Sequence, residues 1–409
     1  MRSTPIDPSN NASLTVSDLM RGGWQRTPVT AALLVGNLAV FVAMLGHGAA
    51  LWHTPNDVQL AWGANFGPAT RDGEWWRLGT AMFVHFGIVH LAINMWALWD
   101  SCRFVERLYG HGRFLVIYGA GGMAGSLFSL SAHGDSAVSG GASGAIFSAF
   151  GALLLWLWRE RRQIDPVEFR WLFGGAAAFA TATIVMGLLI QGIDNASHLG
   201  GLVCGALAGR ALARPLLAHS PVPGAGRWVA AIAFVGVVIA VAAVLPAPAY
   251  RWQEEQKARK EIREFLADER RIAERWRTIF DSGDARGGSF EALAARIESE
   301  VTSEYRDSFE QLSALNLDPD APSAGTLEVL KRYSRMRGDA SHALAEALLQ
   351  NDPRRVREAL EALRHPLYGT GDEALLPSPQ HRQSADLPCF LIPPLYAVLS
   401  RPKLPDSQF

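Results

Sequence analysis

The 409-residue sequence contains few cysteines and has no strong excess of charge of either sign. Cys102, Cys204 and Cys389 are odd in number and far apart, with no C-x-x-C pair, so they form neither a disulfide framework nor a zinc site. We interpret them as buried or idle thiols, and we expect no metal and no other cofactor. The formal net charge of -1 argues against a nucleic-acid partner.

Charged residues are especially scarce in the first part of the chain. They occupy 27 of the first 249 positions but 50 of the last 160. Because a bilayer core takes about 20 apolar helical residues, the first part predicts an all-α polytopic membrane protein. Seven candidate spans follow one another, at about 30–51, 82–99, 114–132, 142–158, 171–191, 196–213 and 228–245. Several of these spans are interrupted by Gly, His, Asn or Ser, which a helix surrounded only by lipid would not need.

The N-terminal arm, residues 1–28, lacks the short apolar run and small-residue cleavage site of a signal peptide, so we expect no removable leader. Arginines gather in this arm and in the loops after spans two, four and six, whereas the alternate loops hold only Arg71 and Arg77. This distribution places the N-terminus in the cytoplasm and the region after the seventh span outside. With no organelle-targeting pattern, we expect a bacterial plasma membrane.

The chain therefore divides into a cytoplasmic arm at 1–28, a six-span core at 29–215, a seventh span at 226–247 and an extracytoplasmic region at 250–409. The last region starts with an amphipathic helical pattern. Further helical patterns cover about 289–315 and 325–364, and a Pro-rich stretch follows from about 376. The apolar positions of the first pattern are Ile262, Phe265, Ile272, Trp276 and Ile279.

Ser143 lies in the segment SGGASGAIFSAF, at the first turn of the fourth span and between Gly141 and Gly144. A serine at a helix start can present its hydroxyl to a substrate, and the unpaired N–H groups there favour a developing negative charge. Close helix packing through small residues is the structural alternative.

His198 lies in the segment DNASHLGGLVCGALAGR, at the first turn of the sixth span. Gly201, Gly205 and Gly209 follow it at four-residue spacing and form a smooth face. We expect this face to contact the fourth span and to bring His198 beside Ser143. An ionisable side chain at membrane depth indicates function, with a carbonyl-bonded structural histidine as the alternative.

His85, His90 and Asn94 lie in VHFGIVHLAINM at the start of the second span, with His90 and Asn94 one helical turn apart. Both of these side chains can donate hydrogen bonds. Together with the amide of Ser143 they can form an oxyanion hole. Polar contacts between helices are the alternative.

Topology joins these residues, because spans two, four and six run in the same direction and share one side of the membrane at their N-terminal ends. A serine with a histidine base and oxyanion donors is the equipment for acyl transfer. Asp194 is four residues before His198 and is expected in the outer loop, so we predict a Ser-His dyad and no triad.

These motifs resemble the rhomboid family of intramembrane serine proteases over about residues 28–215. The resemblance is carried by four separated motifs: GASG at Gly141–Gly144, H-x-x-x-N at His90 and Asn94, His198 with its trailing glycines, and EWWR at Glu74–Arg77. It implies a six-helix bundle with Ser143 as nucleophile, His198 as general base, and His90, Asn94 and the Ser143 amide around the oxyanion. A seventh helix also occurs in the family.

The resemblance also bears on residues around the dyad. Many rhomboids have a tyrosine that stacks on the histidine, and this sequence has Phe147 there, which can pack on His198 but cannot donate a hydrogen bond. Trp76 and Arg77 match a loop motif, to which we assign a structural role as an interfacial anchor. His85, Gly201 and Gly205 are further supporting residues.

The predicted function is endoproteolysis of transmembrane proteins within the lipid bilayer. The alternative is an inactive rhomboid-like factor that binds membrane proteins, although such relatives typically lack the serine or the histidine, and both are present here. A transporter would spread its polar residues through the bilayer midplane of repeated halves, and here they cluster at one end. The sequence leaves the substrate, the oligomeric state and the role of residues 250–409 open.

Overall fold

The computed structural model describes residues 27–213, 224–281 and 289–364, and most of them are helical. The chain forms two compact units, Met1–Pro248 and Ala249–Asp406, which we call the N-terminal and C-terminal units. The prediction of an all-α polytopic protein is confirmed. The arm up to residue 26, the predicted Pro-rich stretch and Cys389 lie outside the described residues.

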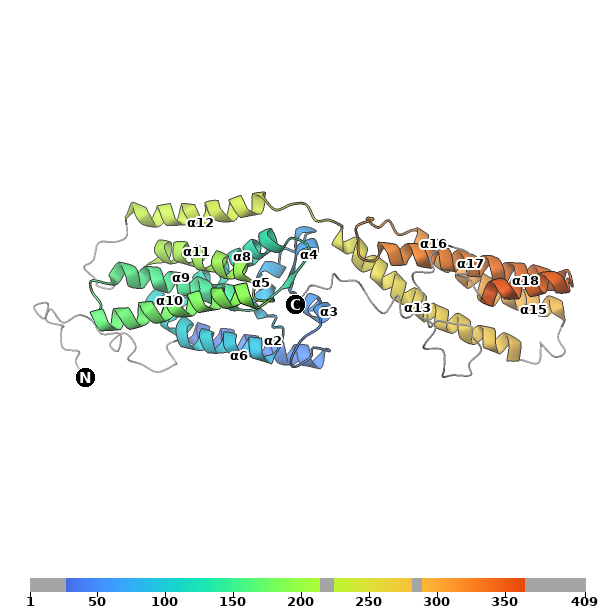
Figure 1. Ribbon diagram of the computed structural model, residues 1–409, viewed down its shortest axis with the longest axis horizontal. Coiled ribbons are helices and arrows are strands. Elements are labelled where there is room, and N and C mark those ends of the chain that lie inside the picture. The colour runs from blue at the N-terminus through green and yellow to red at the C-terminus, as the bar shows by residue number, and fades with distance from the viewer. Residues whose placement is uncertain (1–26, 214–223, 282–288, 365–409) are drawn as a thin grey trace, which may run out of the picture. The chain divides into compact units, whose positions relative to one another are not determined.

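The N-terminal unit contains a long helix for six of the seven predicted spans, and a broken helical segment for the remaining one (Figure 1). Four described helices are long and apolar enough to cross a membrane, namely α2 (Pro28–Gly46), α8 (His111–His133), α10 (Pro166–Leu189) and α12 (Ala225–Ala243). Two further helices, α9 (Ser143–Glu160) and α11 (Asn195–Leu212), hold 18 residues each. They lie between these long helices.

The second predicted span is a broken helix. Its first part comprises α5 (Arg77–Thr80) and the 3-10 turn η2 (Ala81–Phe83), and its second part runs through α6 (Ile88–Ala97), the π-helical turn η3 (Leu98–Cys102) and α7 (Arg103–Tyr109). The two parts meet at 95°. The prediction of one helix over 82–99 is therefore wrong at its start.

The cause of the break is a set of backbone hydrogen bonds to the loop after α2. The Thr54 amide donates to the Phe86 carbonyl at 2.7 Å, and the Ile88 amide donates to the Leu51 carbonyl at 2.8 Å. The Phe86 carbonyl and the Ile88 amide thus bond to the loop and not within a helix. His85 lies in the break, before α6 begins.

Short elements line the same end of the unit. They are α3 (Asn56–Ala61), β1 (Asn65–Phe66), α4 (Gly67–Arg71) and β2 (Val138–Ser139). The strands pair antiparallel, with Asn65 opposite Ser139 and Phe66 opposite Val138. This pairing fixes the segment that leads into Ser143 against the loop between α2 and α6.

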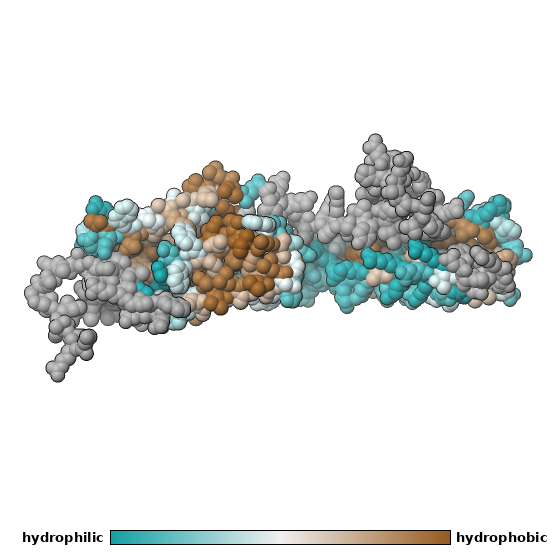
Figure 2. Space-filling view, turned by 90° about the horizontal axis from the view of Figure 1, so that it is seen from below, coloured by the Kyte–Doolittle hydropathy of each residue, from teal (hydrophilic) through white to brown (hydrophobic). Residues whose placement is uncertain are grey.

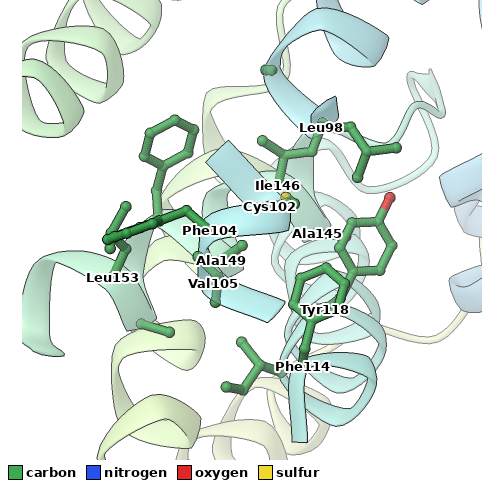
Figure 3. Packing of buried hydrophobic residues seen from close by; sticks show 14 of the residues in the cluster. Leu98, Cys102, Phe104, Val105, Phe114, Tyr118, Ala145, Ile146, Ala149 and Leu153 are labelled. Atoms are coloured by element: carbon green, nitrogen blue, oxygen red, sulfur yellow. The ribbon is translucent and has the colours of Figure 1, made fainter. Parts of the chain in front are cut away.

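The hydrophobic core of the N-terminal unit surrounds α9, which packs most extensively against α11 and α8. Figure 3 shows Ala145, Ile146, Ala149 and Leu153 of α9 facing residues of η3, α7 and α8. Cys102, a buried free thiol, is part of this cluster, as predicted for an idle cysteine. The helix that begins at Ser143 is thus held on several sides.

At the arginine-rich end of the unit, Glu106 on α7 is fully buried and caps α2. Its carboxylate accepts hydrogen bonds from the backbone amides of Val29 and Thr30, at 3.0 and 2.8 Å, and from the Thr30 hydroxyl at 2.7 Å. A carboxylate at a helix N-terminus satisfies amides that have no partner in their own helix. The first and second spans are joined in this way at the end away from Ser143.

Lipid-facing surface is largest on α10 and α12. Only 11% of the most apolar 18-residue window of α10 and 6% of that of α12 are buried. The exposed side chains include Trp171, Leu188 and Ile232, and Figure 2 shows hydrophobic residues gathered over this unit. Such large exposed apolar surfaces mark membrane contact.

The C-terminal unit is a bundle of α13 (Trp252–Asp281), α15 (Phe290–Ile297), the π-helical turn η4 (Glu298–Thr302), α16 (Ser303–Ser313), α17 (Ala324–Leu349) and α18 (Pro353–Arg364). All five apolar positions predicted for its first helix are buried, so that prediction is confirmed. The pattern over 325–364 comprises two helices, because Asn351 has a positive φ of 50° and Pro353 starts a new helix.

A buried polar group lies inside the C-terminal unit. Glu269 Oε1 accepts hydrogen bonds from the Tyr333 and Tyr305 hydroxyls, at 2.5 and 3.1 Å. The guanidinium of Arg337 donates to the Tyr305 hydroxyl at 3.1 Å and to the Leu363 carbonyl at 2.7 Å. Helices α13, α16, α17 and α18 are therefore tied together by a charged network inside this unit.

Candidate active site

Ser143 and His198 lie side by side. Ser143 is the first residue of α9, His198 is in the first turn of α11, and the Ser143 Oγ atom is 2.8 Å from His198 Nε2. A neutral imidazole that carries its proton on Nδ1 accepts the serine hydroxyl proton at Nε2. The two residues are 55 positions apart in sequence, so the packing of α9 on α11 creates the pair.

Among the residues that the structure describes, no carboxylate bonds to the imidazole. His198 Nδ1 is buried and has no hydrogen-bond partner among the described residues. The ring is held instead by Phe147, whose side chain is buried and stacks on it with centroids 4.3 Å apart and an interplanar angle of 3°. The imidazole of His198 therefore has the Phe147 ring on one face and the Ser143 hydroxyl at its edge.

Glycines allow the close approach of the two helices. A Cβ atom added to Gly201 would overlap the Gly144 carbonyl oxygen, and one added to Gly205 would overlap the Ser148 carbonyl oxygen. The predicted contact between the glycine face of the sixth span and the fourth span is confirmed. Main-chain atoms of α9 and α11 touch directly, which brings Ser143 within hydrogen-bond distance of His198.

Gly141 provides space for His90. Its φ of 118° is in the left-handed region that favours glycine. A Cβ atom at this position would lie 2.7 Å from His90 Cε1, so the imidazole packs directly against the Gly141 backbone. The Gly141 amide donates to the Ala81 carbonyl at 2.8 Å, which joins the loop before Ser143 to η2.

The remaining candidates on the second span are close to His90. The His85 and His90 rings are 5.2 Å apart, and His85 Nδ1 is 3.3 Å from the Phe83 carbonyl oxygen. Asn94 is buried and its amide donates one hydrogen to the His90 carbonyl at 2.9 Å. Since an amide has two hydrogens, Asn94 keeps one for another acceptor.

Trp76 and Arg77 lie apart from the dyad. Arg77 is buried and donates to the carbonyls of Leu60 and Ala64, at 2.7 and 3.0 Å, and to the Glu74 carboxylate. Its guanidinium lies 4.6 Å from the centre of the exposed Trp76 ring. These contacts hold the loop after α2 in shape, and neither residue reaches Ser143.

Asp194 makes more contacts than its predicted place in the outer loop indicates. As N-cap of α11 it accepts a hydrogen bond from the Ser197 amide at 2.9 Å, and its other oxygen accepts one from the Ser139 hydroxyl at 2.8 Å. Burial raises the pKa of this carboxyl, but hydrogen bonds from His133, Ser129, the Ser197 amide and Ser139 outweigh burial and lower the pKa to about 2. An aspartate immediately before a helix was the available signal for the cap. Its partner Ser139 had no signal in the sequence.

Among the described residues, no group of three or more His, Cys, Asp or Glu side chains is placed to hold a metal ion. The chemistry available at this site is that of the serine hydroxyl, the imidazole and nearby hydrogen-bond donors. The first-turn amides of α9 have no carbonyl partner within their own helix.

Comparison with known proteins assigns a family to this arrangement. A family model described as the rhomboid domain matches residues 72–215. The chain is 40% identical to the rhomboid protease GluP of Bacillus subtilis over 164 residues, which is 40% of this chain and 31% of GluP. It is 32% identical to the putative rhomboid protease YdcA of the same organism over 168 residues, 41% of this chain and 78% of YdcA. It is also 31% identical to the rhomboid protease AarA of Providencia stuartii over 199 residues, 44% of this chain and 70% of AarA. The family model ends before the C-terminal unit begins.

Proposed function

Because the chain belongs to the rhomboid family, we propose that it is a serine endopeptidase that cleaves transmembrane segments of membrane proteins within the bilayer. The observation that carries the proposal is the separation of 2.8 Å between Ser143 Oγ and His198 Nε2. A nucleophile and a base within hydrogen-bond reach are what covalent acyl transfer needs.

In the first half of the proposed reaction, His198 Nε2 takes the hydroxyl proton while Ser143 Oγ attacks the carbonyl carbon of the scissile peptide bond. The negative charge on the carbonyl oxygen is held by the Ser143 amide, His90 and the second amide hydrogen of Asn94. The tetrahedral intermediate then collapses, the C–N bond breaks, and His198 gives its proton to the leaving amine. An ester joins Ser143 to the new carboxyl end.

In the second half, a water molecule gives a proton to His198 and attacks the ester carbonyl. Collapse breaks the ester bond, and the proton returns from His198 to Ser143 Oγ. Because Nδ1 of His198 has no carboxylate partner among the described residues, the base works as one half of a dyad. The stacked Phe147 ring holds the orientation of the imidazole. A helical peptide bond must unwind locally before it reaches Ser143, which favours substrates with weak helical segments.

The proposed location is the plasma membrane, with the N-terminus in the cytoplasm and the C-terminal unit outside. The support is the arginine distribution along the loops. The substrate-facing ends of α6, α9 and α11 then lie toward the outer surface, and the partners are the lipid bilayer and transmembrane proteins.

The test is cleavage of a single-span substrate by the protein in liposomes, with product masses determined. We expect Ser143→Ala and His198→Ala each to lower turnover by at least about 10³-fold. Ser148→Ala is the matched control, because this serine is also buried on α9 but its hydroxyl donates to the Ile117 carbonyl at 2.7 Å and not to an imidazole. It should retain turnover.

Labelling of Ser143 by a fluorophosphonate gives a second readout that needs no knowledge of the substrate. A wild-type protein that neither cleaves nor takes the label faster than Ser143→Ala would refute the proposed function and favour a binding role.

A further inference from the structure

A second hydrogen bond, between Ser139 and Asp194, joins the same two chain segments as the proposed catalytic pair. Ser139 is four residues before Ser143, and Asp194 is four residues before His198. The Ser139 hydroxyl donates to Asp194 Oδ2 at 2.8 Å, the same distance that separates Ser143 Oγ from His198 Nε2. The same two chain segments are thus joined twice, once at the dyad and once just before it.

Asp194 also joins these segments to α8. Its Oδ1 atom accepts the hydrogen bond from the Ser197 amide and lies 3.4 Å from Nε2 of His133, the last residue of α8. The side chain of Asp194 is 19% exposed. One carboxylate therefore contacts β2, the start of α11 and the end of α8.

The segment just before Ser143 is otherwise attached through its backbone, by the pairing of β2 with β1 and by the bond from the Gly141 amide to the Ala81 carbonyl. Strand β2 has two residues, and Gly140 and Gly141 follow it without side chains that could pack. Two-residue strands contribute little stability by themselves. Besides the dyad itself, the bond from Ser139 to Asp194 is a side-chain link between this segment and the N-cap of the helix that carries His198.

We propose that Asp194 is a positioning residue: through Ser139 it holds Ser143 in place beside His198, within the separation that the main-chain contact of α9 with α11 allows. It does not act as the third member of a triad, because its oxygens bond to the Ser139 hydroxyl and the Ser197 amide, and His198 Nδ1 has no partner among the described residues. This inference rests on the proposed function, since it concerns the geometry of the same dyad.

The test compares kcat and KM of four variants in liposomes. Asp194→Ala removes all the contacts of the carboxylate and should lower kcat about 10- to 100-fold with KM changed by less than about threefold, because a misplacement of about 1 Å near the chemistry has effects of this size. Ser139→Ala removes only one contact and should lower kcat by a smaller factor. Asp194→Asn keeps a polar side chain that can bond to the Ser139 hydroxyl and the Ser197 amide, so it should retain most of the wild-type kcat.

Asp165→Ala is the matched control. Asp165 is the N-cap of α10 and accepts hydrogen bonds from the Val167 and Glu168 amides, at 2.9 and 3.1 Å, so its loss removes the same kind of cap. It should leave kcat within about twofold of wild type, since a cap on another helix does not move the dyad.

The rate of fluorophosphonate labelling separates the outcomes. Slow labelling of Asp194→Ala with normal labelling of Asp165→Ala supports the inference. Equal labelling of wild type, Asp194→Ala and Asp165→Ala, all faster than Ser143→Ala, overturns the positioning role and leaves the protease proposal standing. Wild-type labelling no faster than that of Ser143→Ala overturns both.

Discussion

Replacing Gly201 by alanine is a sharp test of how the dyad is held together. Gly201 is three residues after His198, and a Cβ atom there would lie 3.0 Å from the Gly144 carbonyl carbon and would overlap its oxygen. The obstacle is backbone and cannot rotate away. Because nonbonded heavy atoms pack at about 3.5 Å or more, α11 has to move away from α9 by about 1 Å near this point.

The expected effect follows from the distance across the dyad. Ser143 Oγ and His198 Nε2 are 2.8 Å apart. A shift of about 1 Å takes them beyond about 3.2 Å, the outer range of a good hydrogen bond. We therefore expect Gly201→Ala to lower kcat about 100-fold. The rate at which a fluorophosphonate labels Ser143 should fall by a similar factor.

Gly119→Ala is the control, because Gly119 is on α8 in the same unit and an added Cβ atom meets nothing within 4 Å. Both variants gain the same methyl group in a helix. If Gly201→Ala cleaves a single-span substrate as fast as Gly119→Ala does, main-chain contact between α9 and α11 does not set the dyad geometry and the reasoning fails.

Three further outcomes are expected. Phe147→Leu keeps a buried apolar side chain but loses the stack on His198, worth about 0.5–1.5 kcal/mol, so kcat should fall about 2- to 10-fold in the cleavage assay, and an unchanged kcat would contradict this role. Burial, only partly offset by Arg337, raises the pKa of Glu269, so its stabilising contribution is present below the usual value near 4.5 and is lost as the pH rises through the folded-state pKa. The urea midpoint of the C-terminal unit should therefore fall relative to that of Glu269→Gln as the pH rises above about 4.5, and parallel curves would refute the argument. A chain truncated after Pro248 should label at the wild-type rate, because the N-terminal unit contains the whole dyad, and loss of labelling in a folded truncation would contradict this.

The sequence was sufficient to predict most of the helices, the packing of the sixth span on the fourth, and the juxtaposition of Ser143 and His198. Helical periodicity and small-residue spacing are local signals, and the direction of each span follows from loop charge. These signals place residues at one end of the bundle without any knowledge of side-chain contacts. The roles of the individual residues in catalysis stay proposals.

What the sequence did not predict depends on contacts between distant segments. The break before α6 arises because Leu51 and Thr54 bond to backbone groups at Phe86 and Ile88, and an apolar run does not reveal such a competitor. The break after α17, in contrast, had a local signal in Pro353.

The direct contact between the main chains of α9 and α11 has a consequence for how this unit can vary. Rotamers of large side chains adapt to their surroundings, whereas backbone atoms in contact have a fixed closest approach. The outward faces of α10 and α12, with Trp171 and Ile232 among their exposed residues, take no part in that contact. Their side chains are free to change with bilayer thickness and lipid composition while the distance between nucleophile and base stays the same.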